Sequence, residues 1–171
     1  MSCQDFEGAY AALLTEPPEG AFTADSSQVA GNASVAYLLR LNGRELLFTG
    51  DIEKSVSLDL ATRLDPKLDG RVEVFLVTHH GSKKGSPKEL LDVARPRFAV
   101  LSTGPNGHGH PTVEAISRLK EVPATIWCTD VNGSVTARIS ASGTLTWSTT
   151  GQKAAWWNAN TKKRTGGCVN Q

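Results

Sequence analysis

The chain has 171 residues, of which 39% are hydrophobic and 20% charged, and its formal net charge is +1. This composition predicts one globular domain and argues against general disorder and against a strongly basic nucleic-acid-binding surface. No apolar run approaches the length of a membrane span and no basic, apolar leader opens the chain, so a cytoplasmic location is expected. The three cysteines are far apart, which argues against a disulfide framework and fits a reducing compartment.

Three segments differ in composition. Residues 1–30 are rich in small and polar residues and are expected to be poorly ordered, apart from a possible short helix over residues 6–14. Residues 31–148 carry the alternating apolar pattern of a folded domain. Residues 149–171 form a tail with a tryptophan pair and a basic triplet. These residue types suit a clamp for single-stranded nucleic acid, but a loosely packed tail is the simpler interpretation.

Strands and helices alternate within the folded segment. Residues 35–41 and 44–49 predict a β-hairpin, because Asn42-Gly43 is a strong two-residue turn signal. The helical spacing of apolar residues then predicts a helix over 52–64. The next predicted elements are a strand at 72–78, a helix opened by Ser86-Pro87, a strand at 98–102, a helix at 112–120, a strand at 125–129 and a hairpin over 134–148. This order predicts a layered α/β fold with a mixed sheet.

All four histidines lie between positions 79 and 110. His79 and His80 follow one predicted strand, His108 and His110 follow the next, and Asp51 follows a third. The carboxyl ends of strands in α/β sheets meet at one edge, so these side chains are expected to lie close together. Imidazole and carboxylate are common ligands of Zn²⁺ and Mn²⁺. The sequence therefore predicts a metal site at this edge.

Each of these residues also has a simpler interpretation. Asp51 suits the N-cap of the following helix. Neighbouring residues of an extended strand point to opposite faces, so only one of His79 and His80 is expected at the sheet edge unless the strand has already ended. His110 is held extended by the following proline, which suits a ligand or a general acid, and its simpler interpretation is a solvated loop histidine. His108 is more simply a solvated loop residue.

Polar residues next to the histidines are candidates for binding substrate. A hydroxyl follows the first histidine pair at Ser82. Lys83, Lys84 and Lys88 suit contacts to a phosphodiester, although a solvated lysine surface explains them equally well. The residues assigned to substrate binding are Ser82, Lys83, Asn106 and His108.

Five short strings occur in a characteristic order and spacing: Asn32-Ala33-Ser34, Leu47-Phe48-Thr49-Gly50-Asp51-Ile52-Glu53, Val77-Thr78-His79-His80-Gly81-Ser82-Lys83, Ser102-Thr103-Gly104-Pro105-Asn106 with Gly109-His110-Pro111, and Thr129-Asp130-Val131-Asn132-Gly133. Over roughly residues 30 to 140 the chain resembles the C-terminal half of the metallo-β-lactamase-fold domain of ComEC-type DNA-internalisation competence proteins and their soluble relatives.

This resemblance implies a truncated αββα sandwich whose mixed sheet carries helices on one face, and a hydrolase that acts on DNA through metal-activated water. Asp51 would bridge the metals, and His79, His80 and His110 would be further ligands. Asp51, His80 and His110 are accordingly the expected catalytic residues. The expected cofactor is Zn or Mn, as one or two ions, or none in the isolated chain.

The chain departs from the family pattern in its first half. No histidine precedes position 79, so the family's His-x-His-x-Asp-His string is absent. The chain is therefore expected to be the second half of a longer or split protein, or a degenerate relative. A sheet face would then lack its usual cover, which predicts a homodimer or docking of the missing half. Two further interpretations stay open: an inactive remnant that binds a partner or nucleic acid, and a mononuclear metal store.

Overall fold

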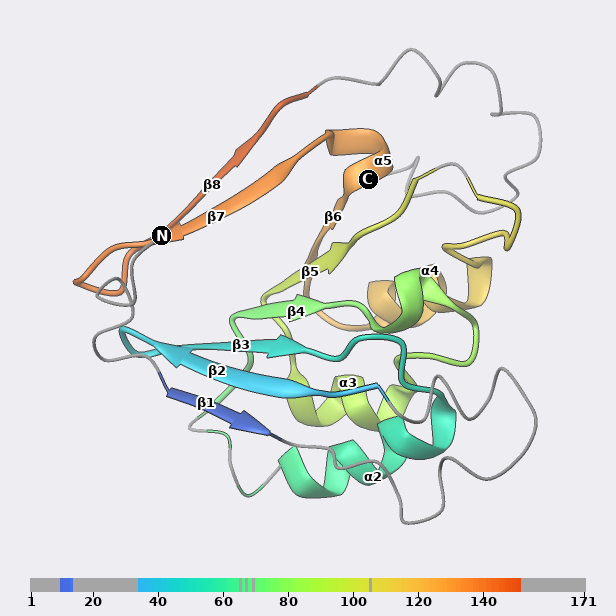
Figure 1. Cartoon of the computed structure of the whole chain (residues 1–171), viewed down its shortest axis with the longest axis horizontal. Coiled ribbons are helices and arrows are strands. Elements are labelled where there is room, and N and C mark those ends of the chain that lie inside the picture. The colour runs from blue at the N-terminus through green and yellow to red at the C-terminus, as the bar shows by residue number, and fades with distance from the viewer. Residues whose placement is uncertain are drawn as a thin grey trace.

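The computed structural model describes residues 10–13, 34–64, 66, 68, 70–104 and 106–151, the first four by their backbone alone. The elements run through the chain as shown in Figure 1. Their bounds in chain order are β1 (Tyr10–Leu13), β2 (Tyr37–Leu41), β3 (Arg44–Phe48), α2 (Lys54–Leu64), β4 (Val74–Leu76), the 3₁₀ turn η3 (Thr78–Gly81), α3 (Lys88–Ala94), β5 (Phe98–Leu101), α4 (Val113–Glu121), β6 (Thr125–Cys128), α5 (Thr129–Asn132), β7 (Val135–Ile139) and β8 (Leu145–Thr149).

The main sheet has six strands in the order β1-β2-β3-β4-β5-β6, and β7 and β8 form a separate two-stranded sheet. The first three strands are antiparallel, whereas β3 to β6 are parallel. Parallel neighbours need crossover connections, and α2, α3 and α4 lie in these connections. The carboxyl ends of β3, β4 and β5 therefore meet at one sheet edge. The predicted layered α/β fold with a mixed sheet is confirmed.

The predicted hairpin is formed by β2 and β3. The two turn residues, Asn42 and Gly43, have φ of 49° and 74°. Positive φ at both positions matches the right-handed twist of the flanking strands, and asparagine and glycine adopt it at low cost. Leu41 pairs with Arg44 across the turn. Local sequence thus sets the register of the first two long strands.

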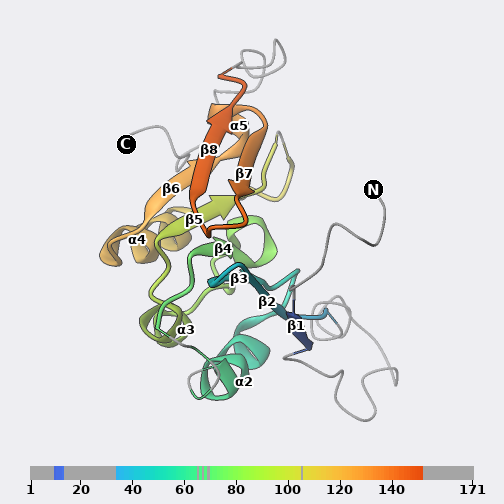
Figure 2. The ribbon, with the colours of Figure 1, turned by 90° about the vertical axis from the view of Figure 1, so that its left-hand side faces the viewer.

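The helices cover one face of the sheet (Figure 2). On this face Leu38, Leu47, Phe75, Ala99 and Ile126 lie side by side on five successive strands, all of them buried. Their register places one apolar residue of each strand in the same row, which fixes the strands relative to one another. The helix residues buried in the same core include Leu60, Leu64, Leu90, Leu91, Ile116 and Leu119.

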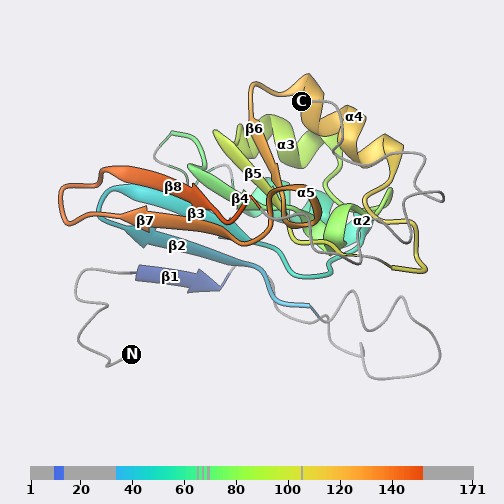
Figure 3. The ribbon, with the colours of Figure 1, turned by 90° about the horizontal axis from the view of Figure 1, so that it is seen from above.

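The β7–β8 hairpin covers part of the opposite face. The ring of Trp147 lies 4.8 Å from that of Phe98 and 6.1 Å from that of Trp127. At the other end of the hairpin, Arg44 Nε donates to the Gly143 carbonyl oxygen at 2.7 Å. Seen from above, the hairpin runs over β2 and β3 (Figure 3). Aromatic packing at one end and polar contacts at the other thus hold it across the sheet.

Two large side chains on this second face stay open to solvent. Tyr37 is 45% exposed and Phe48 38%, and the two are paired across β2 and β3. The structure thus places two partly exposed aromatic side chains next to each other on this face. A homodimer or a docked first half stays a prediction.

The N-terminal segment differs from expectation. Residues 10–13 form the edge strand β1, antiparallel to β2, where a short helix was predicted. The open edge of β2 offers backbone partners that a helix this short would lack. The rest of residues 1–30, the tail tryptophans and the basic triplet lie outside the described residues.

Two further expectations concern the cysteines and the membrane. Cys128 is fully buried as a core residue, and it is also disulfide-bonded. The cysteine pattern therefore no longer argues for a reducing compartment. Within the described ranges, every helix is too short or too polar to cross a bilayer.

Candidate functional site

Three loops at the carboxyl ends of β3, β4 and β5 bring the predicted site residues together. His80 Nε2 lies 3.6 Å from Asp51 Oδ1. The His79 ring centroid lies 5.3 Å from that of His110 and 6.5 Å from that of His80. We call Asp51, His79, His80 and His110 the rim. The structure brings these four residues together at one sheet edge, and their roles as ligands or catalytic groups stay predictions.

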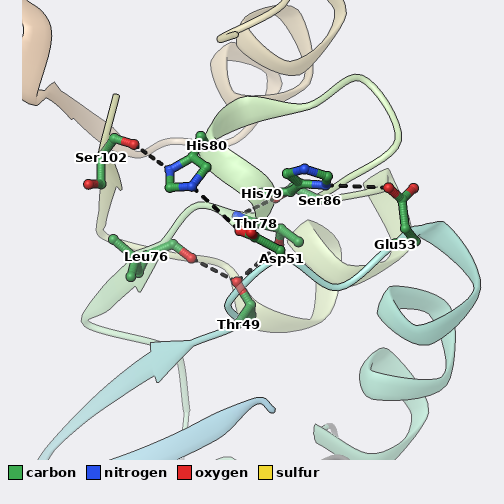
Figure 4. A network of polar contacts seen from close by, with 9 residues as sticks. All are labelled: Thr49, Asp51, Glu53, Leu76, Thr78, His79, His80, Ser86 and Ser102. Atoms are coloured by element: carbon green, nitrogen blue, oxygen red, sulfur yellow. Dashed lines mark hydrogen bonds and ion pairs between the residues drawn. The ribbon is translucent and has the colours of Figure 1, made fainter. Parts of the chain in front are cut away.

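A network of buried hydroxyl groups lies beneath the rim (Figure 4). The Oγ1 atoms of Thr49 and Thr78 are 3.1 Å apart, and the Thr78 N–H donates to Ser86 Oγ at 3.3 Å. Both threonines are fully buried. Thr49 stands two residues before Asp51, and Thr78 directly precedes His79. The network therefore ties the loop that carries Asp51 to the loop that carries the histidine pair.

Replacing Thr49 with valine tests this network. Valine keeps the shape but removes the hydroxyl that donates to the Leu76 carbonyl oxygen at 2.9 Å and contacts Thr78. Because the substitution leaves buried polar groups without a partner, we expect urea titration to show a loss of about 2 kcal/mol in the free energy of unfolding. Thr62→Val is the matched control, because the Thr62 hydroxyl is exposed on α2, and a change within about 0.5 kcal/mol is expected there. Equal losses in the two variants would contradict a role for the network.

The histidine pair has an unusual backbone. His79 has φ 49° and ψ 47°, and His80 has φ 53° and ψ 25°, both in the left-handed region. Strand β4 has already ended at Leu76, so the alternation of an extended strand no longer applies and both histidines contact other groups at the rim. Non-glycine residues in this region cost energy, and such residues cluster at functional sites.

A backbone carbonyl group fixes the orientation of the His80 ring. Its Nδ1 lies 2.7 Å from the carbonyl oxygen of Ser102. A carbonyl oxygen only accepts, so Nδ1 carries the hydrogen and donates it. Nε2 is then the atom that faces Asp51. A backbone carbonyl that fixes one ring nitrogen presents the other in a defined direction, as proton-transferring and metal-binding histidines require.

His79 faces a carboxylate that sequence reasoning missed. Its Nδ1 lies 3.3 Å from Glu53 Oε1, and this buried nitrogen makes no hydrogen bond to any of the described residues. Glu53 stands two residues after Asp51, in the same loop. That short spacing of two acidic residues was the available signal. Two histidines of the rim thus each face a carboxylate: His79 faces Glu53, and His80 faces Asp51.

A cavity of about 340 Å³ opens beside the rim. Its lining contains three of the four histidines: the residues are His80, Ser102, Thr103, Gly104, Asn106, His108 and His110. Burial lowers the pKa of His110, and the nearby His79, His108 and His80 lower it further, while Asp51 acts in the opposite direction. His110 is therefore a neutral proton acceptor at neutral pH.

The lowered pKa of His110 predicts a pH dependence of stability. The unfolded chain takes up the proton at a higher pH than the native protein does, so stability from His110 is fully present above the unfolded value near pH 6.5 and is lost as the pH falls toward the native pKa. Urea titrations at pH 7.5 and 5.5 should show a smaller loss on acidification for His110→Gln than for the unmodified protein. An unchanged loss in His110→Gln would contradict the assignment.

The predicted substrate-binding residues differ in their availability. Ser82 is only 7% exposed, and its hydroxyl accepts from the Lys84 N–H at 3.3 Å, so it stabilises its own turn. Lys88 pairs with Asp92 at 2.7 Å, and the hydrogen bond to Asp92 raises the pKa of Lys88. Lys83 is exposed. Asn106 and His108 line the cavity.

The rim does not by itself fit a resident metal ion. Among the described residues, no three His, Cys, Asp or Glu side chains are arranged to hold one. His80 and Asp51 present two facing donor atoms, whereas zinc sites use three or four protein ligands. The predicted Zn or Mn site therefore stays a prediction.

Together these features define a protein of the α/β class with a histidine-rich polar site at the carboxyl edge of its parallel strands, where ligands bind in such folds.

Comparison with known proteins narrows this class. No family model matches the chain. It is 28% identical over 108 residues to ComE operon protein 3 of Bacillus subtilis, 32% over 108 residues to Recombination protein 2 of Haemophilus influenzae, and 28% over 102 residues to Competence protein ComA of Neisseria gonorrhoeae.

These matches cover 63%, 62% and 59% of this chain but only 14%, 13% and 14% of the three relatives. The chain thus spans about a seventh of the length of the curated relatives it matches. The matches support a relationship to competence-related proteins of the ComEC type. The resemblance to ComEC-type competence proteins that the sequence motifs indicate agrees with these matches.

Proposed function

We propose that this chain is a metallo-β-lactamase-like hydrolase segment of a ComEC-type competence protein and that it acts on phosphodiester bonds of DNA. The observation that carries the proposal is the oriented His80–Asp51 pair beside a cavity that His80 and His110 both line. Phosphodiester hydrolysis needs a group that accepts a proton from water and a group that donates one to the leaving oxygen. The named relatives supply the competence context.

The roles follow from the contacts of each residue. His110, whose pKa is lowered by burial, is suited to accept a proton. His80 is held by the Ser102 carbonyl with Nε2 toward Asp51, which suits it to pass a proton at the cavity wall. Exposed Lys83 offers a positive charge near the histidine pair for a DNA phosphate. The resemblance also implies Zn²⁺ or Mn²⁺, but the described ligand set is incomplete, so these roles concern the proton and the substrate alone.

Hydrolysis assays on the purified chain test the proposal. The substrates are bis-p-nitrophenyl phosphate and end-labelled single-stranded DNA, each with EDTA, with Zn²⁺ and with Mn²⁺. Cleavage in at least one condition is the expected result, and metal analysis of the protein tests the cofactor prediction separately. Absence of cleavage in every condition would contradict hydrolase activity of the chain.

A second candidate function is a catalytically inactive module that binds DNA or a partner. The incomplete ligand set of the rim and the exposed Tyr37 and Phe48 favour it. DNA binding without cleavage, or a dimer in sedimentation analysis that Tyr37→Ser disrupts, is the result this candidate predicts.

A further inference from the structure

Asn106 makes an unusual number of contacts within its own loop. Its Nδ2 donates to the Gly104 carbonyl at 2.9 Å and to the His110 carbonyl at 2.8 Å. Its Oδ1 accepts from the His108 N–H at 3.0 Å and from the His110 N–H at 3.1 Å. An asparagine side chain offers two donated and two accepted hydrogen bonds, so all four are used. The amide therefore has no spare donor for a substrate, although it lines the cavity.

The surroundings of this loop make those four bonds important. Gly107 and Gly109 lie in open space, because a Cβ built on either would meet no atom within 4 Å. Packing therefore does not restrain this part of the loop, and glycine adds backbone freedom. Thr103 adds one longer contact, from its Oγ1 to the His110 carbonyl at 3.3 Å. Among the residues that the structure describes, Asn106 alone bonds to both backbone groups of His110.

We infer that Asn106 is a positioning residue, which fixes His110 against the rest of the rim by bonding its backbone on both sides. The His110 ring lies 5.3 Å from the His79 ring and 6.1 Å from the His108 ring, and Asn106 bonds the backbone of both His108 and His110. Without these bonds the glycine-containing loop would sample many conformations. The consequence for catalysis rests on the proposed function, whereas the positioning itself does not.

Two substitutions distinguish the hydrogen bonds that the Asn106 side chain donates from those that it accepts. Asn106→Ala removes all four bonds. Asn106→Asp keeps the two accepted bonds but places a carboxylate against the two carbonyl oxygens. Asn132→Ala is the matched control, because Asn132 also accepts a backbone N–H, that of Cys128 at 2.9 Å, in another turn. Amide hydrogen exchange and the nuclear Overhauser contact between the His79 and His110 rings are measured by NMR on the whole chain.

In Asn106→Ala, the His108 and His110 amides should exchange about tenfold faster, as expected for loss of one hydrogen bond each, and the contact between the two rings should weaken. In Asn106→Asp, the two amides should stay more protected than in the alanine variant while the ring contact still weakens. Asn132→Ala should change neither. A chain active in hydrolysis should also lose kcat with little change in KM.

An unchanged His79–His110 ring contact in both Asn106 variants would overturn the inference, even if the amides exchange faster. Faster exchange throughout β5 and α4 as well would show a general structural role instead, and would overturn it too. Because the NMR measurements need no activity, a chain without hydrolase activity leaves the test of Asn106 intact.

Discussion

Replacement of Gly81 by alanine is expected to destabilise the protein by about 3 kcal/mol, because two penalties combine. Gly81 has φ +82°, a conformation that costs a residue with a Cβ atom. That Cβ would also lie 2.6 Å from Pro111 Cβ and 2.8 Å from Leu101 Cδ2. The loop that carries the histidine pair packs directly on the Pro111 segment and has no room for a methyl group.

Urea titration of Gly81→Ala measures this effect. Gly107→Ala is the control in the neighbouring loop, since a Cβ there meets nothing within 4 Å, and a change of less than about 0.5 kcal/mol is expected. The Gly81 carbonyl also accepts from the Thr112 N–H at 2.9 Å, so a shift of this glycine would move the two loops apart. Equal stability of the two variants would contradict the close approach.

Asp51→Asn is expected to reduce phosphodiester hydrolysis about 100-fold or more, within the range found for loss of proton-transfer groups. The amide keeps the size of the side chain but removes the negative charge 3.6 Å from His80 Nε2. The Asp51 side chain is 50% exposed, so little change in folding stability should accompany the loss. The measurement is kcat/KM on bis-p-nitrophenyl phosphate and on single-stranded DNA.

Asp92→Asn is the matched control for this experiment. Asp92 is an exposed aspartate on α3 whose partner is Lys88, and it is not part of the rim. Its substitution should leave kcat/KM within about twofold, as expected for a surface ion pair of small energy. Similar activities of the Asp51 and Asp92 variants would remove Asp51 from the mechanism.

Features with a local cause could be predicted from the sequence. The turn at Asn42-Gly43 needs only two residues with positive φ, and each buried strand is visible in the sequence as a short apolar run. The alternation of strands and helices gives a largely parallel sheet, and the carboxyl edge of such a sheet gathers its loops. The approach of Asp51, His80 and His110 follows from that topology without knowledge of any side-chain contact.

Features with a long-range cause could not be predicted. The left-handed backbone of His79 and His80 occurs where the next residue, Gly81, packs on Pro111 thirty residues later. Ser86 was expected to cap a helix, yet its hydroxyl accepts from the Thr78 N–H. Contacts of this kind depend on how distant segments pack together, so no periodic pattern in the sequence predicts them.

Ligand geometry is more demanding still. The resemblance gave four candidate ligands, and in the fold Asp51 lies 3.6 Å from His80 while the His79 ring lies 5.3 Å from that of His110 and 6.5 Å from that of His80. A metal site needs the donor atoms themselves to converge on one point, with distances set to a few tenths of an ångström. Rotamers and loop backbones decide that convergence, and residue spacing does not encode it.

The proposed binding of DNA at the rim and its neighbouring cavity is tested most directly by a titration of ¹⁵N-labelled chain with a short single-stranded oligodeoxynucleotide, followed by NMR. The account predicts that the largest chemical-shift changes fall on residues 79–83 and 102–110, and that Asp51→Asn, His80→Gln and His110→Gln alter them. Shifts confined to the β7–β8 hairpin or to the helical face, with the rim resonances unchanged, would contradict the account.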